Sequence, residues 1–335
     1  MNMRADLTAD LKGAALQAGH QGVNETTEMA TETTMLAPRF YTTDFAEMDR
    51  IDVTPVREEW DALIAQMKSD PNRSHFKKTA DWDAIDWDGM DWDHNVIPHE
   101  FVHSWDGKYR RPADLWTPDY QQPMQNTLLW VYEGQTQFWG YVLAARSGVQ
   151  DRKTVLGMFA SAAAKYAEGT PGRSWRSVED TTHAPILNQR RPLPYGSLTR
   201  GEDYYVEGAL VWLEADQIIR QGTQGAKGLD DFARAFFGVR DGDWGQLTYD
   251  FDEVVRTLNA VHPYDWATFL RTRLYQPGQP APLRGVEMSG YKLVWKDQPN
   301  PYDKGVSDYR KSLDLTYSLG LSLDSDGTVT SALWD

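Results

Sequence analysis

The chain has 335 residues, of which 41% are apolar and 12% aromatic, so it can bury a sizeable core and form two or three units. Its formal net charge of −15 at pH 7 argues against a nucleic-acid partner, because an acidic surface repels phosphates. The absence of Cys excludes disulfides and thiolate ligands, and no apolar run approaches the ~20 residues that span a bilayer. Any bound metal must therefore be held by His, Asp or Glu.

The N-terminal 90 residues differ in character from the rest. Residues 1–35 are polar and without periodicity, which predicts a disordered tail. They lack the apolar stretch of a signal peptide, so a cytoplasmic location is the default expectation. Apolar side chains at helical spacing predict an amphipathic helix over 55–67. Asp-Trp-Asp then occurs three times between 81 and 93, which favours an acidic linker; a calcium loop is the alternative, without its usual Gly and Glu placement.

Helices dominate from residue 94, and the pattern changes after Pro277-Gly278-Gln279-Pro280. The predicted helices are 97–105, 127–146, 152–167, 205–221, 230–237, 251–261 and 265–275. Gly148 is expected to end the second helix, and Asp230 to cap the fifth. Period-two runs at 291–295, 319–323 and 328–330 predict strands, with a turn at 324–327. The sequence thus predicts a mainly α fold in three parts, 1–90, 91–277 and a β-rich 278–335.

Two histidines stand at metal-ligand spacing in the segment Ile97 to Trp105. His99 and His103 are four residues apart, so on a helix they share one face and can grip one zinc ion. Glu100 follows His99 and can take a proton from a metal-bound water molecule. The alternative is a pair of solvent-exposed or core histidines without a metal.

A third ligand is expected from a second helix. Glu133 lies among aromatic and aliphatic residues on a long apolar helix, and a buried carboxylate needs a partner, which a cation supplies. The alternative is a glutamate on the helix surface. The sequence therefore predicts one Zn²⁺ bound by His99, His103 and Glu133, with a fourth position left for water whose pKa the metal lowers.

Taken in order, these motifs resemble the glycyl aminopeptidase family, a branch of the gluzincin metallopeptidases. The matching segments are 97–108, 111–112, 129–136, 204–211 and 229–234. The resemblance implies zinc, a peptide substrate, a thermolysin-like helical catalytic subdomain and a PDZ-like domain after it, of which 318–335 resembles only the opening. Relatives of this family are often exported to the periplasm.

The same resemblance implies a role for a tyrosine. Related aminopeptidases place a catalytic Tyr in a Tyr-x-x-Gly pattern, and the segment from Tyr205 to Gly208 fits it. The phenol would donate a hydrogen bond to the developing oxyanion. Tyr204 could do the same, and an ordinary packing role is the remaining alternative.

One family feature is missing. The family carries a Gly-Gly-Leu-Glu-His type segment that helps to hold the amino end of the substrate, and this chain has none. His94 is too isolated to replace it and is expected to lie on a loop. Whether the chain would act as an exopeptidase or an endopeptidase stays open.

Residues 24–80 resemble a different family, the aerobic magnesium-protoporphyrin monomethyl ester cyclase, at 35–49, 56–61 and 70–76. That enzyme needs a di-iron site with two Glu-x-x-His pairs. This chain has one such pair, Glu100 to His103, and it belongs to the zinc motif. No di-iron ligand can be assigned, so the chain looks like a junction of two unrelated pieces.

Three functions follow from these motifs. The first is a zinc metallopeptidase, aminopeptidase-like, in which Glu100 activates the metal-bound water that attacks the peptide bond. The second is a fragment of the cyclase. The third is a non-catalytic interaction protein with a degenerate peptidase body, whose partial PDZ strand could pair with a partner's edge.

Overall fold

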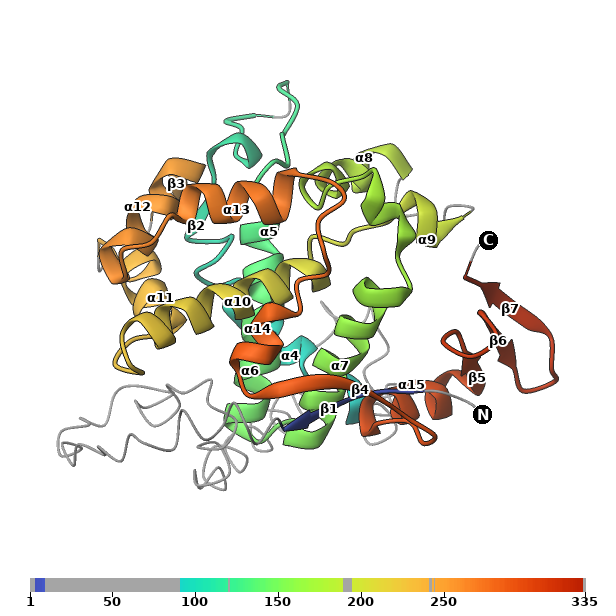
Figure 1. Cartoon of the computed structure of the whole chain (residues 1–335). Coiled ribbons are helices and arrows are strands. Elements are labelled where there is room, and N and C mark those ends of the chain that lie inside the picture. Colours follow the sequence, from blue (N-terminus) through green and yellow to red (C-terminus); the bar gives the residue numbers. More distant parts are fainter. Residues whose placement is uncertain are drawn as a thin grey trace, which may run out of the picture.

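The computed structural model describes residues 4–9, 91–119, 121–188, 195–240, 243 and 245–333. The predicted helix 55–67, the first two Asp-Trp-Asp repeats and the cyclase-like segment lie outside the described residues. The third repeat forms the 3₁₀ helix η3 (Asp91–Asp93). As predicted, the described part is mainly helical, with small sheets (Figure 1).

The helices α6 and α10 form the centre of the molecule, and the other helices pack around this pair. The α-helices are α4 (Val96–Val102), α5 (Leu129–Tyr132), α6 (Gly134–Ser147), α7 (Arg152–Glu168), α8 (Ala184–Asn188), α9 (Gly196–Thr199), α10 (Val206–Gly222), α11 (Leu229–Phe237), α12 (Phe251–Val261), α13 (Trp266–Tyr275), α14 (Arg284–Met288) and α15 (Pro301–Arg310). α6 packs against α4 and α10, and α10 also contacts α7 and α14 (Figure 1). The short α4 is therefore held against the central pair.

Most predicted helices are confirmed, and local signals explain their ends. The Asp151 carboxylate accepts from the backbone N–H of Thr154 at the start of α7, 3.1 Å away, and so satisfies a donor that the helix leaves free. Gly148 ends α6 with φ of 70°, a conformation that favours glycine. The predicted helix 127–146 is interrupted at Glu133, which lies between α5 and α6.

The prediction that Asp230 caps a helix is wrong. α11 begins at Leu229 after Gly228, and Asp231 accepts from the Gly228 N–H, 2.9 Å away. Asp230 instead binds the Arg146 guanidinium with both oxygens, at 2.8 and 2.9 Å. The buried Arg146 on α6 thus recruits the carboxylate that the local pattern assigned to the cap.

The described strands form three small sheets. β1 (Arg4–Ala9) pairs with β4 (Tyr291–Lys296), β2 (Arg110–Pro112) pairs in parallel with β3 (Leu247–Tyr249), and β5 (Ser312–Leu315), β6 (Leu321–Asp324) and β7 (Val329–Ala332) form an antiparallel sheet. The period-two runs therefore predict β4, β6 and β7 correctly, whereas β5 and α15 were not predicted. Among the described helices, none has the length and apolarity needed to cross a bilayer.

β1 corrects the prediction of a disordered tail for residues 4–9, whereas the rest of 1–35 lies outside the described residues. Residues 4–9 pair with β4 along its full length, in antiparallel register. Ala5 and Leu7 are buried in the core, and Arg4 binds Asp314, 3.1 Å away. The Asn300 side-chain amide donates to the Ala5 carbonyl, 2.9 Å away. The strand is stabilised by these distant partners, which its own sequence does not reveal.

Glycines let the three central helices approach closely. A Cβ atom on Gly134 would lie 2.6 Å from the Tyr204 carbonyl oxygen, and one on Gly208 would lie 3.0 Å from the Gly134 Cα. At Gly140, a Cβ atom would lie 3.1 Å from the His99 Cβ. α6 therefore touches α10 and α4 along its glycine positions, and any larger residue there would push the helices apart.

We expect Gly134→Ala to lower the free energy of unfolding by about 1–3 kcal/mol, because the added methyl group overlaps the Tyr204 carbonyl. Urea unfolding followed by circular dichroism measures this. Gly196→Ala is the control, since its Cβ would have no atom within 4 Å, and its change should stay within about 0.5 kcal/mol. Equal stability of the two variants would contradict close packing of α6 on α10.

Candidate metal centre

α4 places two histidines on one face. His99 lies within the helix and His103 directly follows its last residue, and their ring centroids are 4.9 Å apart. The His103 N–H donates to the His99 carbonyl, 3.4 Å away, so the helical turn continues through both residues. Pro98 is tolerated because it lies in the first turn. The predicted helix is confirmed, although it ends at Val102 rather than Trp105.

Glu133 completes the cluster from the junction of α5 and α6. Its Oε2 atom lies 3.5 Å from His99 Nε2 and 3.3 Å from His103 Nε2. The three ligand atoms lie within 4.8 Å of one another. In the described part of the chain, no other group of three such side chains could hold a metal ion. The structure thus brings together the three residues that the sequence singled out.

The cluster changes the pKa of Glu133 and of His103. Burial raises the pKa of Glu133, but the two imidazoles lower it more, to about 2, so the carboxylate is ionised. Burial lowers the pKa of His103, but Glu133, the Asp106 carbonyl and Glu100 outweigh it, so the pKa lies above its ordinary value. The cluster is therefore one negative charge shared between two imidazoles.

The donor set fits a zinc ion. Glu133 Oε2 is buried and, among the described residues, has no partner at hydrogen-bond geometry. It faces the Nε2 atoms of His99 and His103, so two nitrogens and one oxygen converge on one point, as in catalytic zinc sites. A cation there would satisfy the oxygen that is otherwise without a donor.

The turn after α4 orients His103, a detail that the sequence did not reveal. His103 Nδ1 lies 2.9 Å from the Asp106 backbone carbonyl, which fixes the ring and directs Nε2 toward Glu133. The Tyr132 ring lies beside the imidazole, with centroids 5.0 Å apart. Gly107, at φ of 120°, leaves room for that ring, since a Cβ atom would lie 2.5 Å from it. The contact with the Asp106 carbonyl has no sequence signature, because it involves a backbone atom. Only Gly107 could have indicated a special turn after α4.

The Asp106 side chain is a second feature that sequence reasoning missed. It is fully buried, and burial together with the nearby Glu133 carboxylate raises its pKa well above the usual range. The hydroxyls of Tyr249 and Thr136 lie 3.3 and 3.4 Å from its oxygens. Asp106 thus links the turn after α4 to β3 and α6 beneath the cluster.

Glu100 and Tyr205 lie near different histidines of the cluster. Glu100 is exposed on α4 and close enough to raise the pKa of His103. The Tyr205 ring is half-buried and stacks on the His99 ring, with centroids 6.2 Å apart. Tyr204 is 1% exposed, so a substrate could reach only the Tyr205 phenol of this pair. His94 is not part of the cluster, and its Nδ1 lies 3.2 Å from the Val149 carbonyl.

Comparison with known proteins supports both resemblances seen in the sequence. Residues 92–211 match the family model of the M61 glycyl aminopeptidases, a stretch that contains all five predicted site residues. The match covers less than half of the chain and ends at Val211. For the C-terminal part, the resemblance to this family stays a prediction.

The N-terminal resemblance is short. The chain is 48% identical over 58 residues to the aerobic magnesium-protoporphyrin IX monomethyl ester [oxidative] cyclase of Rubrivivax gelatinosus, which is 17% of this chain and 16% of that protein. The Cyanidium caldarium cyclase is 42% identical over 57 residues, again 17% and 16%. The chain therefore spans only 16% of the length of these curated relatives.

We expect the cluster to bind one zinc ion, with an affinity that falls as the pH is lowered. Zinc needs neutral imidazoles, so protonation of His103 competes with it, and the raised pKa of His103 moves this competition to higher pH than for an ordinary histidine. Below that pKa, affinity should fall about tenfold per pH unit for each proton displaced. Competition with a chelator over a pH series measures it. A flat profile, or unchanged binding in Glu133→Gln, would contradict the site.

Proposed function

We propose that the chain is a zinc-dependent metallopeptidase, aminopeptidase-like, that hydrolyses peptide bonds. One observation carries the proposal: two imidazole nitrogens and a buried carboxylate oxygen without a hydrogen bond converge beside the exposed Glu100. The match of residues 92–211 to a peptidase family supports it. The donor set is the one expected of a catalytic zinc site with three protein ligands.

In this proposal, His99, His103 and Glu133 hold the ion. Zinc, when bound, would supply Lewis acidity and lower the pKa of a water molecule. Glu100 takes the proton of the attacking water and passes it to the leaving amine, because its carboxylate lies beside the ligands and is open to solvent. Its position one residue after His99 keeps it off the ligand face of α4.

Tyr205 stabilises the oxyanion that forms when water attacks the peptide carbonyl. Its phenol donates a hydrogen bond to the scissile carbonyl oxygen as negative charge develops there. The stacking of its ring on His99 keeps the phenol beside the reacting group. The rigid start of α10 holds it there, so the donor needs no rearrangement during the reaction.

The domain assignment follows from this function. We propose that 91–277 is a thermolysin-like catalytic domain and that 278–335 leads into a PDZ-like module. The support is that α4, which positions the two histidines, packs against α6, which begins directly after Glu133, and that β5, β6 and β7 form a separate small sheet (Figure 1). The choice between exopeptidase and endopeptidase activity depends on how the amino end of the substrate is held.

We expect Glu100→Gln to keep stoichiometric zinc and to lower kcat by about 10²–10⁴, because the amide cannot accept the proton. Zinc content by atomic emission and hydrolysis of glycyl- and alanyl-naphthylamide measure the two effects. Zinc at one per chain without any turnover in the wild-type chain would retain the metal site and discard the enzyme, in favour of an interaction protein.

We expect Tyr205→Phe to lower kcat by about 10²–10³ at unchanged zinc content, because one oxyanion donor is lost. Tyr204→Phe is the matched control, since its phenol is buried and should leave kcat within a few fold. The reverse ranking of the two variants would assign the donor to Tyr204.

A further inference from the structure

A buried ionic network surrounds the first turn of α10. Asp203 and Glu207 are 3% and 1% exposed, and the basic side chains of Lys165, Arg173 and Arg200 bind them. The Lys165 ammonium lies 2.7 Å from Asp203 Oδ1. Burying a carboxylate is costly unless such partners surround it, so removing any one of these partners should destabilise the fold.

Arg200 joins the two carboxylates. Its Nε donates to Asp203 Oδ2, 2.8 Å away, and its Nη2 donates to Glu207. Its backbone has φ of 58°, which is unfavourable for a residue with a side chain. Arg176 helps to hold it, because the Arg200 Nη1 donates to the Arg176 carbonyl, 2.6 Å away. A strained conformation persists only where the surroundings over-determine it.

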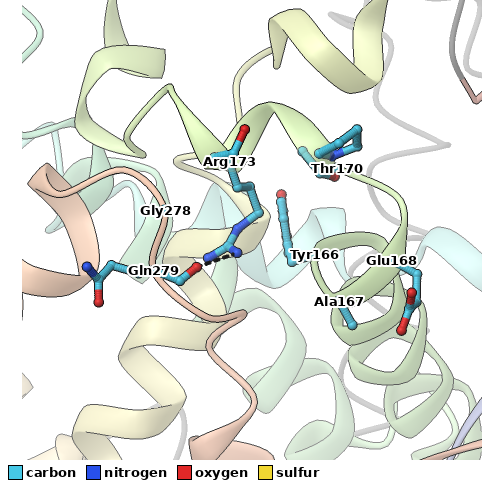
Figure 2. Close-up of a pocket in the computed structure, with 9 residues that line it drawn as sticks. Tyr166, Ala167, Glu168, Thr170, Arg173, Gly278 and Gln279 are labelled. Atoms are coloured by element: carbon cyan, nitrogen blue, oxygen red, sulfur yellow. Dashed lines mark hydrogen bonds between the residues drawn. The ribbon is translucent and has the colours of Figure 1, made fainter.

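Arg173 reaches Glu207 from the surface. Its Nε and Nη2 lie 2.8 and 2.6 Å from Glu207 Oε1, and its Nη1 lies 2.9 Å from the Gln279 carbonyl. Figure 2 shows this side chain beside a hollow of about 310 Å³, lined also by Tyr166 and Thr170. The hollow contains none of the metal-cluster residues.

Tyr205 lies at the middle of the turn that this network encloses. The Glu207 N–H donates to the Asp203 carbonyl, 2.9 Å away, so the side chains of these two residues hold both ends of the turn. From the opposite side, the Tyr204 carbonyl lies against Gly134, the residue after Glu133. The turn is therefore held between the ionic network and the helix that begins beside the metal ligand.

We propose that Glu207 is a positioning residue that holds the Tyr205 phenol over the metal cluster. This inference rests on the proposed function. Glu207 does not touch the reacting atoms; it fixes the backbone two residues after Tyr205 through Arg173 and Arg200. Loss of its charge removes the anion that Arg173 and Arg200 share, and the turn shifts. A displacement of about 1 Å at a reacting group can cost about 10²-fold in rate.

The test compares Glu207→Gln with Glu214→Gln in the full chain. Glu214 is a matched control, because it lies on the same helix, is fully buried and binds Arg273 and Arg284 at 3.0 and 3.2 Å. Both variants should lose melting temperature to a similar extent and keep one zinc per chain. Only Glu207→Gln should lower kcat, by about 10–100-fold, with KM changed by less than threefold.

A double mutant separates positioning from a general structural effect. In the Tyr205→Phe background, Glu207→Gln should cause no further loss of kcat, because the phenol that it positions is absent. An equal loss in both backgrounds, or an equal loss in Glu214→Gln, would overturn the proposal. Arg173→Lys, which keeps the charge but loses the fork geometry, gives a milder variant with a smaller loss of kcat if Glu207→Gln does not fold.

Hydrogen exchange gives a readout that does not need activity. In the metal-free chain, Glu207→Gln should speed amide exchange at residues 205–209 at least tenfold, and Glu214→Gln should leave those amides unchanged. Unchanged exchange in Glu207→Gln would overturn the positioning role. Absence of hydrolysis by the wild-type chain would instead sink the proposed function, and the exchange comparison would still decide whether Glu207 holds the turn.

Discussion

The attraction between one buried carboxylate and two imidazoles is the interaction on which the centre of this molecule depends. Glu133 is the only negative charge of the three, and its Oε2 lies within 3.5 Å of both Nε2 atoms. Burial raises the pKa of Glu133, but the imidazoles lower it to about 2. The position of α4 relative to the α5–α6 junction thus follows from an electrostatic requirement as much as from packing.

The helices α4, α6 and α10 meet near that cluster, and a different set of contacts fixes the position of each one. α4 is held by the close approach of His99 to Gly140 and by the Asp106 carbonyl. α6 touches α10 backbone to backbone at Gly134, and α10 starts within a buried ionic network. Sites on packed helices hold their geometry better than sites on loops, because packing locks the rotamers. The arrangement suits chemistry that needs a fixed donor rather than a moving one.

The sequence predicted the parts of this arrangement that local spacing encodes. Four-residue spacing placed His99 and His103 on one face, and apolar neighbours identified Glu133 as a carboxylate in need of a partner. Spacing could not identify the Asp106 carbonyl, because a backbone atom leaves no mark on the sequence. The local pattern predicted Asp230 as a helix cap, but its carboxylate binds Arg146, which is 84 residues away in the sequence. A backbone atom three residues away decided the first of these failures, and a side chain distant in the sequence decided the second.

β1 has a consequence for the segment between residues 10 and 90. Because residue 9 ends a strand on β4 and residue 91 begins η3, which leads into α4, both ends of that segment are tied to the same folded body. Loss of the six residues of β1 would leave that segment joined to the folded body at residue 91 alone, and it would leave β4 without its strand partner.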